Sequence, residues 1–252
     1  VKAEKKVSFL HCDYKKIHAF SKYNANVYKG FDAIAACSAG CKEAFLAVFP
    51  ELAQKVQVVH NCHDFAQIRQ NAAQAQVALQ KDVLNILTVS RFGKEKGILR
   101  GIQAVADLQK SGKQIHYYII GDGVEYLEAA AMIKRHGLET TVTLLGEMDN
   151  PYGYMKEADV LLIPSFSEAA PMVIGEAACL GTPILSTRTT SVNEMIVQPG
   201  YGWVCENTQE GIRESLERLL SNPEILKKCS EGMKQIVFTN ADAINEFTRL
   251  SL

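Results

Sequence analysis

Short runs of β-branched and other apolar residues alternate with longer stretches of helical periodicity along the whole chain. The runs that we expect to form strands are Val7–Leu10, Ala33–Cys37, Val56–His60, Leu84–Ser90, His116–Ile120, Val142–Leu145, Val160–Pro164, Pro183–Ser186 and Tyr201–Val204. Most of them are apolar at successive positions, which is typical of a parallel sheet covered by helices on both faces. The alternation therefore predicts a doubly wound α/β architecture.

The stretches between these runs favour helices, and two more helices close the chain. We expect helices at Lys15–Tyr28, Cys41–Phe49, Ala66–Asn71, Gly97–Ser111, Tyr126–His136, Tyr152–Glu157, Met172–Leu180, Ser191–Val197, Ile212–Ser221, Glu224–Phe238 and Ala241–Leu252. Ser191 and Glu194 have the spacing of a capping box, which predicts that each bonds to the backbone of its own helix start.

A change in composition divides the pattern into two blocks. Residues 70–82 are rich in Gln and Ala, which indicates an interdomain connector open to helical structure. Residues 83–236 hold enough predicted strands for a complete Rossmann-like sheet. Residues 1–72 hold fewer strands than a stable α/β domain usually has, so we expect the C-terminal part of a second domain. The connector itself is placed at residues 73–82, and residues 237–252 are assigned to a closing helix.

The composition excludes several classes of protein. Hydrophobic residues make up 47% and charged residues 22%, a globular balance that excludes disorder throughout. The formal charge of −1 gives no reason to expect a nucleic-acid partner. The apolar runs fall short of the roughly 18–20 residues that a membrane span needs, and the charged start of the chain is unlike a signal peptide.

Seven cysteines lie mostly inside apolar stretches. This odd number fits reduced, buried thiols better than a disulfide framework, so we expect a cytoplasmic protein. The basic and aromatic stretch at residues 15–31 is compatible with contact at the inner face of a membrane. A solvated helix face explains the same pattern.

Two carboxylates lie on either side of a predicted helix start. Glu168 follows a buried strand, Pro171 fits the first turn of the next helix, and Glu176 lies inside that helix. The backbone N–H groups near Met172 and Val173 would then face any anion docked there. Two carboxylates beside an anion site suit the hydroxyl groups of a sugar phosphate. Taken alone, each glutamate is better explained as a solvated surface residue, and the surrounding motifs are what favour a binding role.

Cations and glycines follow the first two strands of the larger block. Arg91 and Lys96 lie in the strand–loop–helix position where α/β sheets bind phosphate. Gly121 ends the next strand in a Gly-Asp-Gly turn that permits close approach to a ligand. Taken separately, these residues also fit a solvated loop and an ordinary turn.

The motifs occur in a recognisable order. The sequence contains V-S-R-F-G-K-E-K-G, then I-I-G-D-G, then L-L-G, then A-D-V-L-L-I-P-S-F-S-E-A-A-P-M-V-I-G-E-A. This order and spacing resemble glycosyltransferase family 4, the retaining GT-B enzymes that use nucleotide-sugar donors. The resemblance covers residues 83 to about 200. It implies a GT-B fold that consists of the complete donor domain and part of the acceptor domain.

The resemblance assigns roles to the charged residues. Glu168 matches the glutamate that usually binds the donor sugar hydroxyls near the reacting carbon, and we class it as catalytic. Glu176 matches the glutamate that binds the ribose hydroxyls. Arg91 and Lys96 match the cations that neutralise the donor diphosphate, which implies a donor site that works without a metal or other cofactor.

Backbone positions carry over in the same way. Met148 matches a position that usually contacts the nucleotide base, and Met172 and Val173 match the segment that meets the diphosphate and sugar. Ala169 replaces a common Gly, and Gly175 replaces a usual bulky apolar residue, so this sequence departs from the family pattern twice. A glycine within a helix costs roughly 0.5–1 kcal/mol relative to Ala, so we expect altered helix packing at Gly175.

The first block matches the end of the family's acceptor domain. His11 follows a predicted strand and matches the loop histidine that faces the donor, so we class it as a second catalytic candidate. The family's Gly-rich loop has no counterpart before it, which implies a fragment lacking about 100 residues or more. The closing helix resembles the family's crossing helix. We expect its apolar positions Ile244, Phe247 and Leu250 to be uncovered.

Two cysteine and histidine patterns have simpler explanations. His60, Cys62 and His63 are metal-ligand types but fall short of the four arranged ligands of structural zinc. Cys37 and Cys41 are four residues apart and are explained by packing at a helix start. We therefore expect no metal site in this chain.

The expected activity is retaining transfer of a sugar from a nucleotide-diphosphate sugar to a hydroxyl of a saccharide or lipid-linked acceptor. A UDP-sugar is the favoured donor and a GDP-sugar the second. Bacterial cell-surface polysaccharide or glycolipid synthesis is the expected setting. Three alternatives stay open: a nucleotide-sugar epimerase, a glycogen-synthase-like enzyme, and a donor-binding module that is inactive as this fragment.

Overall fold

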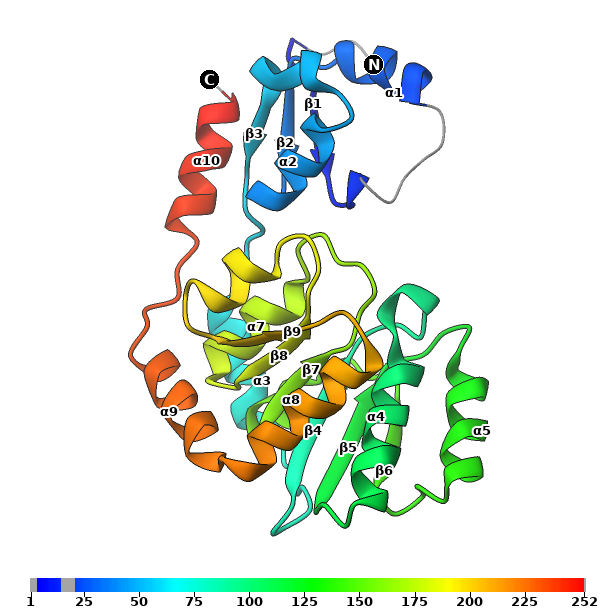
Figure 1. Ribbon diagram of the computed structural model, residues 1–252. Helices are drawn as coiled ribbons and strands as arrows, with labels where there is room; N and C mark the ends of the chain where they lie inside the picture. Colours follow the sequence, from blue (N-terminus) through cyan, green and yellow to red (C-terminus); the bar gives the residue numbers. More distant parts are fainter. Residues whose placement is uncertain (1–3, 15–20, 252) are drawn as a thin grey trace.

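The computed structural model describes residues 4–14 and 21–251, which form two parallel sheets (Figure 1). The smaller sheet has the order β1-β2-β3, with β1 (Val7–Leu10), β2 (Ala33–Ala36) and β3 (Val56–Val58). The larger sheet has the order β6-β5-β4-β7-β8-β9. Its strands are β4 (Leu84–Val89), β5 (Ile115–Ile120), β6 (Val142–Gly146), β7 (Val160–Ile163), β8 (Ile184–Thr187) and β9 (Gly202–Cys205).

Helices connect these strands. They are α1 (Ser21–Lys29), α2 (Ala39–Leu46), α3 (Phe65–Gln74), α4 (Ile98–Lys110), α5 (Tyr126–His136), α6 (Tyr152–Glu157), α7 (Met172–Leu180), α8 (Gln209–Ser221), α9 (Pro223–Lys234) and α10 (Ala241–Ser251). Two 3-10 turns, η2 (Pro50–Lys55) and η3 (Lys94–Lys96), and a π-helical turn, η4 (Asn193–Val197), complete the described elements. The predicted strands are all present, with ends that differ by at most two residues.

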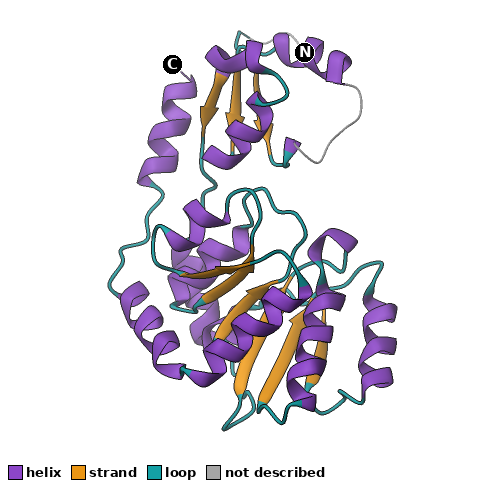
Figure 2. Cartoon of the chain, in the orientation of Figure 1, coloured by secondary structure: helices purple, strands orange, loops and turns teal. Residues whose placement is uncertain are grey.

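The larger sheet is buried on both faces (Figure 2), as the apolar strands predict. Ile86 of β4 packs into a core formed with α4, α5 and α8. Its neighbour Leu87 points the opposite way and packs with α6, α7 and η4. Successive strand residues alternate between faces, so one strand contributes to both cores. The doubly wound fold is confirmed.

The strand order reverses between β4 and β7. Strands β4, β5 and β6 follow one another toward one edge of the sheet. Strand β7 then pairs with the other side of β4. In open α/β sheets, ligands bind beyond the carboxyl ends of the strands at such a reversal. The loops after β4 and β7 therefore meet where a binding crevice is expected.

The chain enters the larger domain through α3. This helix packs against α6 and α7, so residues 65–74 lie with the larger sheet. The expected helical character of the Gln- and Ala-rich segment holds up to Gln74, and residues 75–80 have no regular structure. The predicted helix at Lys15–Tyr28 falls partly outside the described residues, since α1 is described from Ser21.

Helix α10 returns to the smaller sheet and runs alongside it (Figure 1). Leu250 is buried against Ala33, Ala35 and Val59. The expectation of uncovered positions is therefore wrong for Leu250, because the sheet itself covers it. Ile244 and Phe247 are exposed as expected, although the Phe247 ring also stacks near Phe9.

Two crossing segments, residues 59–64 and 235–240, link the domains. They are bonded to each other, since Asn240 accepts from the His63 N–H at 3.0 Å and donates to the His63 carbonyl oxygen at 2.8 Å. The His63 ring also lies where a side chain at Gly175 would stand. The space that a side chain at Gly175 would fill is therefore occupied by a histidine from the crossing segment, and packing that differs from the family's stays a prediction.

Direct contacts also join the domains. The hydroxyls of Ser38 and Ser191 are 2.6 Å apart, and the Gly40 N–H donates to Glu194 at 3.2 Å. Thr190 donates to Asp13 at 2.5 Å. The capping-box prediction for Ser191 and Glu194 is wrong, because both side chains bond to the start of α2 in the other domain.

No helix in residues 4–14 and 21–251 is both long and apolar enough to cross a bilayer.

Candidate functional site

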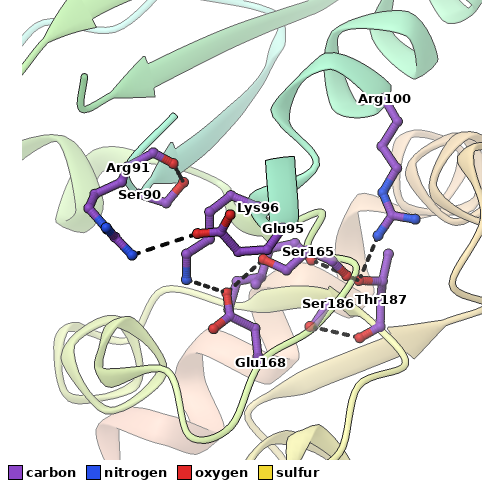
Figure 3. A network of polar contacts seen from close by, with 10 residues as sticks. Ser90, Arg91, Glu95, Lys96, Arg100, Ser165, Glu168, Ser186 and Thr187 are labelled. Atoms are coloured by element: carbon purple, nitrogen blue, oxygen red, sulfur yellow. Dashed lines mark hydrogen bonds and ion pairs between the residues drawn. The ribbon is translucent and has the colours of Figure 1, made fainter. Parts of the chain in front are cut away.

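A cavity of about 260 Å³ opens at the carboxyl ends of β4 and β7. Three segments line it: the loop after β4, the loop after β7, and the first turns of α7. Six residues predicted to bind a donor are among its walls, namely Arg91, Lys96, Glu168, Met172, Val173 and Glu176. The fold thus brings together residues that lie up to 85 positions apart in the sequence. Figure 3 shows the polar network at this edge.

Lys96 and Glu168 form the closest ion pair in this cavity. The Lys96 Nζ lies 2.7 Å from the Glu168 Oε1, and Ser165 donates to the same oxygen at 2.7 Å (Figure 3). The two charged side chains are only 19% and 10% exposed. Charge-assisted hydrogen bonds of this kind contribute about 1.5–3 kcal/mol. An ammonium group has three donors, so Lys96 keeps donors for a ligand while it holds Glu168.

Arg91 lies at the rim of the cavity. Its side chain is exposed, and its guanidinium is 3.6 Å from the Glu95 carboxylate. An exposed pair of this kind contributes little to stability. The guanidinium is therefore able to turn toward an anion at small energetic cost.

Glu176 differs from Glu168 in its surroundings. It lines the inner part of the cavity on α7, and burial raises its pKa. Within the described part of the chain its carboxylate forms no ion pair. The neighbouring Tyr152 also has a raised pKa, first from burial and then from the charge of Glu176. A half-buried carboxylate without a cation is suited to accept hydrogen bonds from ligand hydroxyls.

The start of α7 offers backbone donors. The helix spans Met172–Leu180 as predicted, with Pro171 as its N-cap residue, and no side chain caps it. The first turn also lacks an acidic residue. The N–H groups of Met172 and Val173 therefore meet the cavity with the positive end of the helix dipole, which favours an anion.

Three predicted residues lie outside the cavity walls. Gly121 has φ +135°, and a side chain there would collide with the Ser90 carbonyl oxygen. The close approach that it permits is therefore to the protein backbone, and a ligand contact stays a prediction. Met148 packs against the core formed by α6 and α7. His11 is exposed at the carboxyl end of β1, with its ring stacked near Phe9.

Sequence reasoning missed Ser165, whose hydroxyl orients Glu168. The signal was available, because Ser165 lies in the loop just after β7, three residues before the glutamate. A small hydroxyl residue at that spacing in a tight loop readily bonds to a nearby carboxylate.

Among the described residues, the His, Cys, Asp and Glu side chains form no cluster of three suited to an ion. His60 instead pairs with Glu246 of α10, and His63 packs against α7. The two histidines of the crossing segment thus contact different helices, His60 α10 and His63 α7. Whether the donor site works without a metal stays a prediction.

A larger hollow of about 930 Å³ lies at the opposite, amino-terminal end of the sheet. Its walls include Asp82, Lys113, Asp159 and Lys227. The candidate site residues gather at the smaller cavity, where the sheet reverses and a helix start faces inward. Parallel sheets bind ligands at that end, so we assign the candidate site to the smaller cavity.

Comparison with known families agrees with this geometry. The family described as "Glycosyl transferases group 1" matches residues 69–236, more than half of the chain. The chain belongs to the group 1 glycosyl transferases. The matched region contains the whole larger sheet and every residue of the cavity.

Two relatives illustrate the range of this glycosyl transferase group. The N-acetylgalactosamine-N,N'-diacetylbacillosaminyl-diphospho-undecaprenol 4-alpha-N-acetylgalactosaminyltransferase of Campylobacter jejuni is 29% identical over 210 residues, which cover 82% of this chain and 56% of the relative. The N-acetyl-alpha-D-glucosaminyl L-malate synthase of Bacillus anthracis is 26% identical over 154 residues, which cover 61% and 40%. The chain thus spans about half the length of the curated relatives it matches.

Solved structures of other proteins share the fold. Anabaena Alr3699/HepE in complex with UDP-glucose superposes with a TM-score of 0.77 at 20% identity, and the match covers 97% of this chain and 70% of that one. WaaG, a glycosyltransferase involved in lipopolysaccharide biosynthesis, gives 0.69 at 19% identity over 91% and 70%. The GT-B fold class is confirmed.

Proposed function

We propose that this chain binds the nucleotide-diphosphate sugar of a retaining glycosyltransferase, which moves the sugar to an acceptor hydroxyl in bacterial polysaccharide or glycolipid synthesis. One observation carries the proposal. Two cations, two carboxylates and an uncapped helix start line a single cavity at the reversal of the sheet. This combination matches a ligand that has both anionic phosphates and neutral hydroxyl groups.

Each group has a role in this proposal. Lys96, Arg91 and the N–H groups at the start of α7 bind the diphosphate. Glu176 accepts from the ribose hydroxyls, and Glu168 accepts from the donor sugar near the reacting carbon. As the bond between sugar and phosphate breaks, negative charge grows on the leaving diphosphate. Preorganised cations and backbone donors stabilise that charge more than they stabilise the ground state.

The known proteins support the choice of ligand. Alr3699/HepE was solved with UDP and with UDP-glucose, so a UDP-sugar is the favoured donor and a GDP-sugar the second candidate. The Campylobacter relative is named for a diphospho-undecaprenol acceptor, which supports a saccharide or lipid-linked acceptor here. We place the reaction in the cytoplasm. Contact of the basic stretch at residues 15–31 with the inner membrane face remains a proposal, and residues 15–20 of that stretch lie outside the described residues.

We further propose that the chain by itself binds donor but transfers sugar slowly. Bringing the reacting groups into one closed cleft is worth roughly 7–11 kcal/mol, and this chain spans about half the length of its curated relatives. His11 stays the candidate on the opposite wall, in the loop whose Asp13 accepts from Thr190 of the donor domain.

Isothermal titration with UDP, GDP and ADP tests the donor site directly. We expect UDP to bind most tightly, and ADP to serve as the mismatched control. Equal affinity for UDP, GDP and ADP would show that the donor site does not select the nucleotide base. Product analysis with a labelled UDP-sugar separates transfer from epimerisation, because an epimerase returns a changed nucleotide sugar without any acceptor.

A further inference from the structure

Arg100 of α4 is a buried cation beside the candidate site. It is 7% exposed, and burial lowers the pKa of its guanidinium to about 10, which leaves it charged at neutral pH. Within the described part of the chain it pairs with no carboxylate. A buried charge costs free energy unless polar partners surround it, so its contacts need an explanation.

The guanidinium bonds to three separate segments, namely the loop after β7, the end of β8 and the loop after β9. Its Nε donates to the Pro164 carbonyl oxygen at 2.7 Å, just after β7. One terminal nitrogen donates to the Asn207 carbonyl oxygen at 3.3 Å, and the other to the Thr187 hydroxyl at 3.4 Å. The plane of the group also stacks on the Phe166 ring, 3.7 Å from its centroid. A planar fork with several donors makes these contacts together, which Lys or an apolar residue would not.

The partners of Arg100 hold the same loop. The Thr187 hydroxyl donates to the Ser165 carbonyl oxygen at 2.5 Å, and the Asn207 amide donates to the Phe166 carbonyl oxygen at 3.2 Å. The Phe166 N–H donates to the Glu95 carbonyl oxygen at 2.8 Å. Each peptide carbonyl from Pro164 to Phe166 thus has a defined partner, and Arg100 bonds directly to Pro164, Thr187 and Asn207.

The start of α4 is shaped for this contact. Gly97 has φ +64°, and a side chain there would collide with the Pro164 carbonyl oxygen and the Arg100 Nε. The loop after β7 therefore lies directly on the helix start. Glu168 follows two residues after Phe166, so any shift of the loop moves the carboxylate that Lys96 and Ser165 hold.

We propose that Arg100 is a positioning residue that fixes segment Pro164–Phe166 and thereby sets where Glu168 meets the donor sugar. This proposal rests on the proposed function. Arg100 does not line the cavity, so it acts through the loop and not on the ligand. Its loss affects the contact with the sugar and spares the contacts that bind UDP.

The test compares Arg100→Met, Arg100→Lys and Glu168→Gln in the full 252-residue chain. Arg213→Met is the matched control, since Arg213 is paired with Glu210 and Glu217 on α8. Titration measures the dissociation constants for UDP and for UDP-glucose or UDP-N-acetylglucosamine, whichever binds more tightly. We expect Arg100→Met to weaken UDP-sugar binding about 10-fold and UDP binding less than about 3-fold. Adding Glu168→Gln to Arg100→Met should weaken UDP-sugar binding little further, because both changes remove the same contact with the sugar.

Hydrogen exchange of the same proteins gives a readout that needs no ligand. We expect faster amide exchange in residues 165–170 of both Arg100 variants, with the β4 and β5 amides unchanged. Arg100→Lys keeps the positive charge, and it replaces Arg100→Met in these measurements if Arg100→Met does not fold. Equal losses for UDP and UDP-sugar, or unchanged loop exchange, would overturn the proposal. Failure of the unsubstituted chain to bind UDP would instead count against the proposed function, while the exchange data still decide whether Arg100 fixes the loop.

Discussion

The ammonium group of Lys96 and the carboxylate of Glu168 meet through a single oxygen, Oε1, at 2.7 Å. Ser165 donates to the same oxygen. Two donors on Oε1 fix the plane of the carboxyl group and leave Oε2 as the oxygen available to a ligand. The pair therefore gives the proposed sugar contact a defined direction before any ligand binds.

Replacing the two cavity glutamates should separate their roles. We expect Glu176→Gln to weaken UDP and UDP-sugar equally, because ribose is present in both ligands. Glu168→Gln should weaken mainly the UDP-sugar. Each loss should be on the order of 1.5–3 kcal/mol, as for hydrogen bonds to a charged group. Titration calorimetry measures both, with exposed Glu157→Gln as the control, and identical profiles for the two variants would refute the assignment.

The stability of the protein should depend on pH through Glu176. Burial raises the pKa of this carboxyl in the folded state, so folding favours its protonated form. The resulting stability is complete below the unfolded value of about 4.3 and is lost as pH rises through the raised folded value. Glu176→Gln removes this titration. Thermal unfolding should show a larger gain in Tm for the variant at pH 7 than at pH 4, and a gain independent of pH would contradict the raised pKa.

Donor binding should not need a divalent metal. Lys96, Arg91 and the start of α7 supply the positive charge that a metal would otherwise bring to the diphosphate. We expect the dissociation constant for UDP to stay the same after treatment with EDTA. A loss of binding that Mg²⁺ or Mn²⁺ restores would show that the diphosphate is held through an ion.

Filling the space at Gly175 should disturb the crossing segment. A Cβ at this position would overlap the His63 ring, so Gly175→Ala must displace it. Overpacking of this kind typically costs about 1–3 kcal/mol. We expect a lower Tm for Gly175→Ala and a recovery in the double variant with His63→Ala. The single change His63→Ala is the control, and no recovery in the double variant would mean that the strain lies elsewhere.

The strands and the cavity were predictable because their signals are local. Ile86 and Leu87 are both apolar, and only a strand covered on two faces buries both. Glu168 and Lys96 come from loops after neighbouring parallel strands, which must end at the same edge. Knowledge of the architecture was therefore enough to place them together.

The long-range polar contacts were not predictable. Arg100 lies on a helix whose sequence does not reveal that it reaches Pro164, 64 residues away. Glu194 has the spacing of a capping box with Ser191, yet its partner is the Gly40 N–H, 154 residues away. A local motif indicates which hydrogen bonds a side chain is able to make, and tertiary packing decides which of them forms.

The paired crossings between the domains have a mechanical consequence. A body attached to another at two adjacent points keeps one easy rotation, about the line through those points, and resists sliding and twisting. Here the covalent attachments are the segments at residues 59–64 and 235–240, which are hydrogen-bonded to each other through His63 and Asn240. The contacts of Asp13, Ser38 and Gly40 with the donor domain are non-covalent and are able to separate. The segment at residues 59–64 also touches the donor loop, since the Asn61 amide donates to the Ala170 carbonyl oxygen at 3.3 Å. Opening and closing of the cleft would therefore turn beside the loop of Glu168, so that hinge angle and donor-sugar geometry change together.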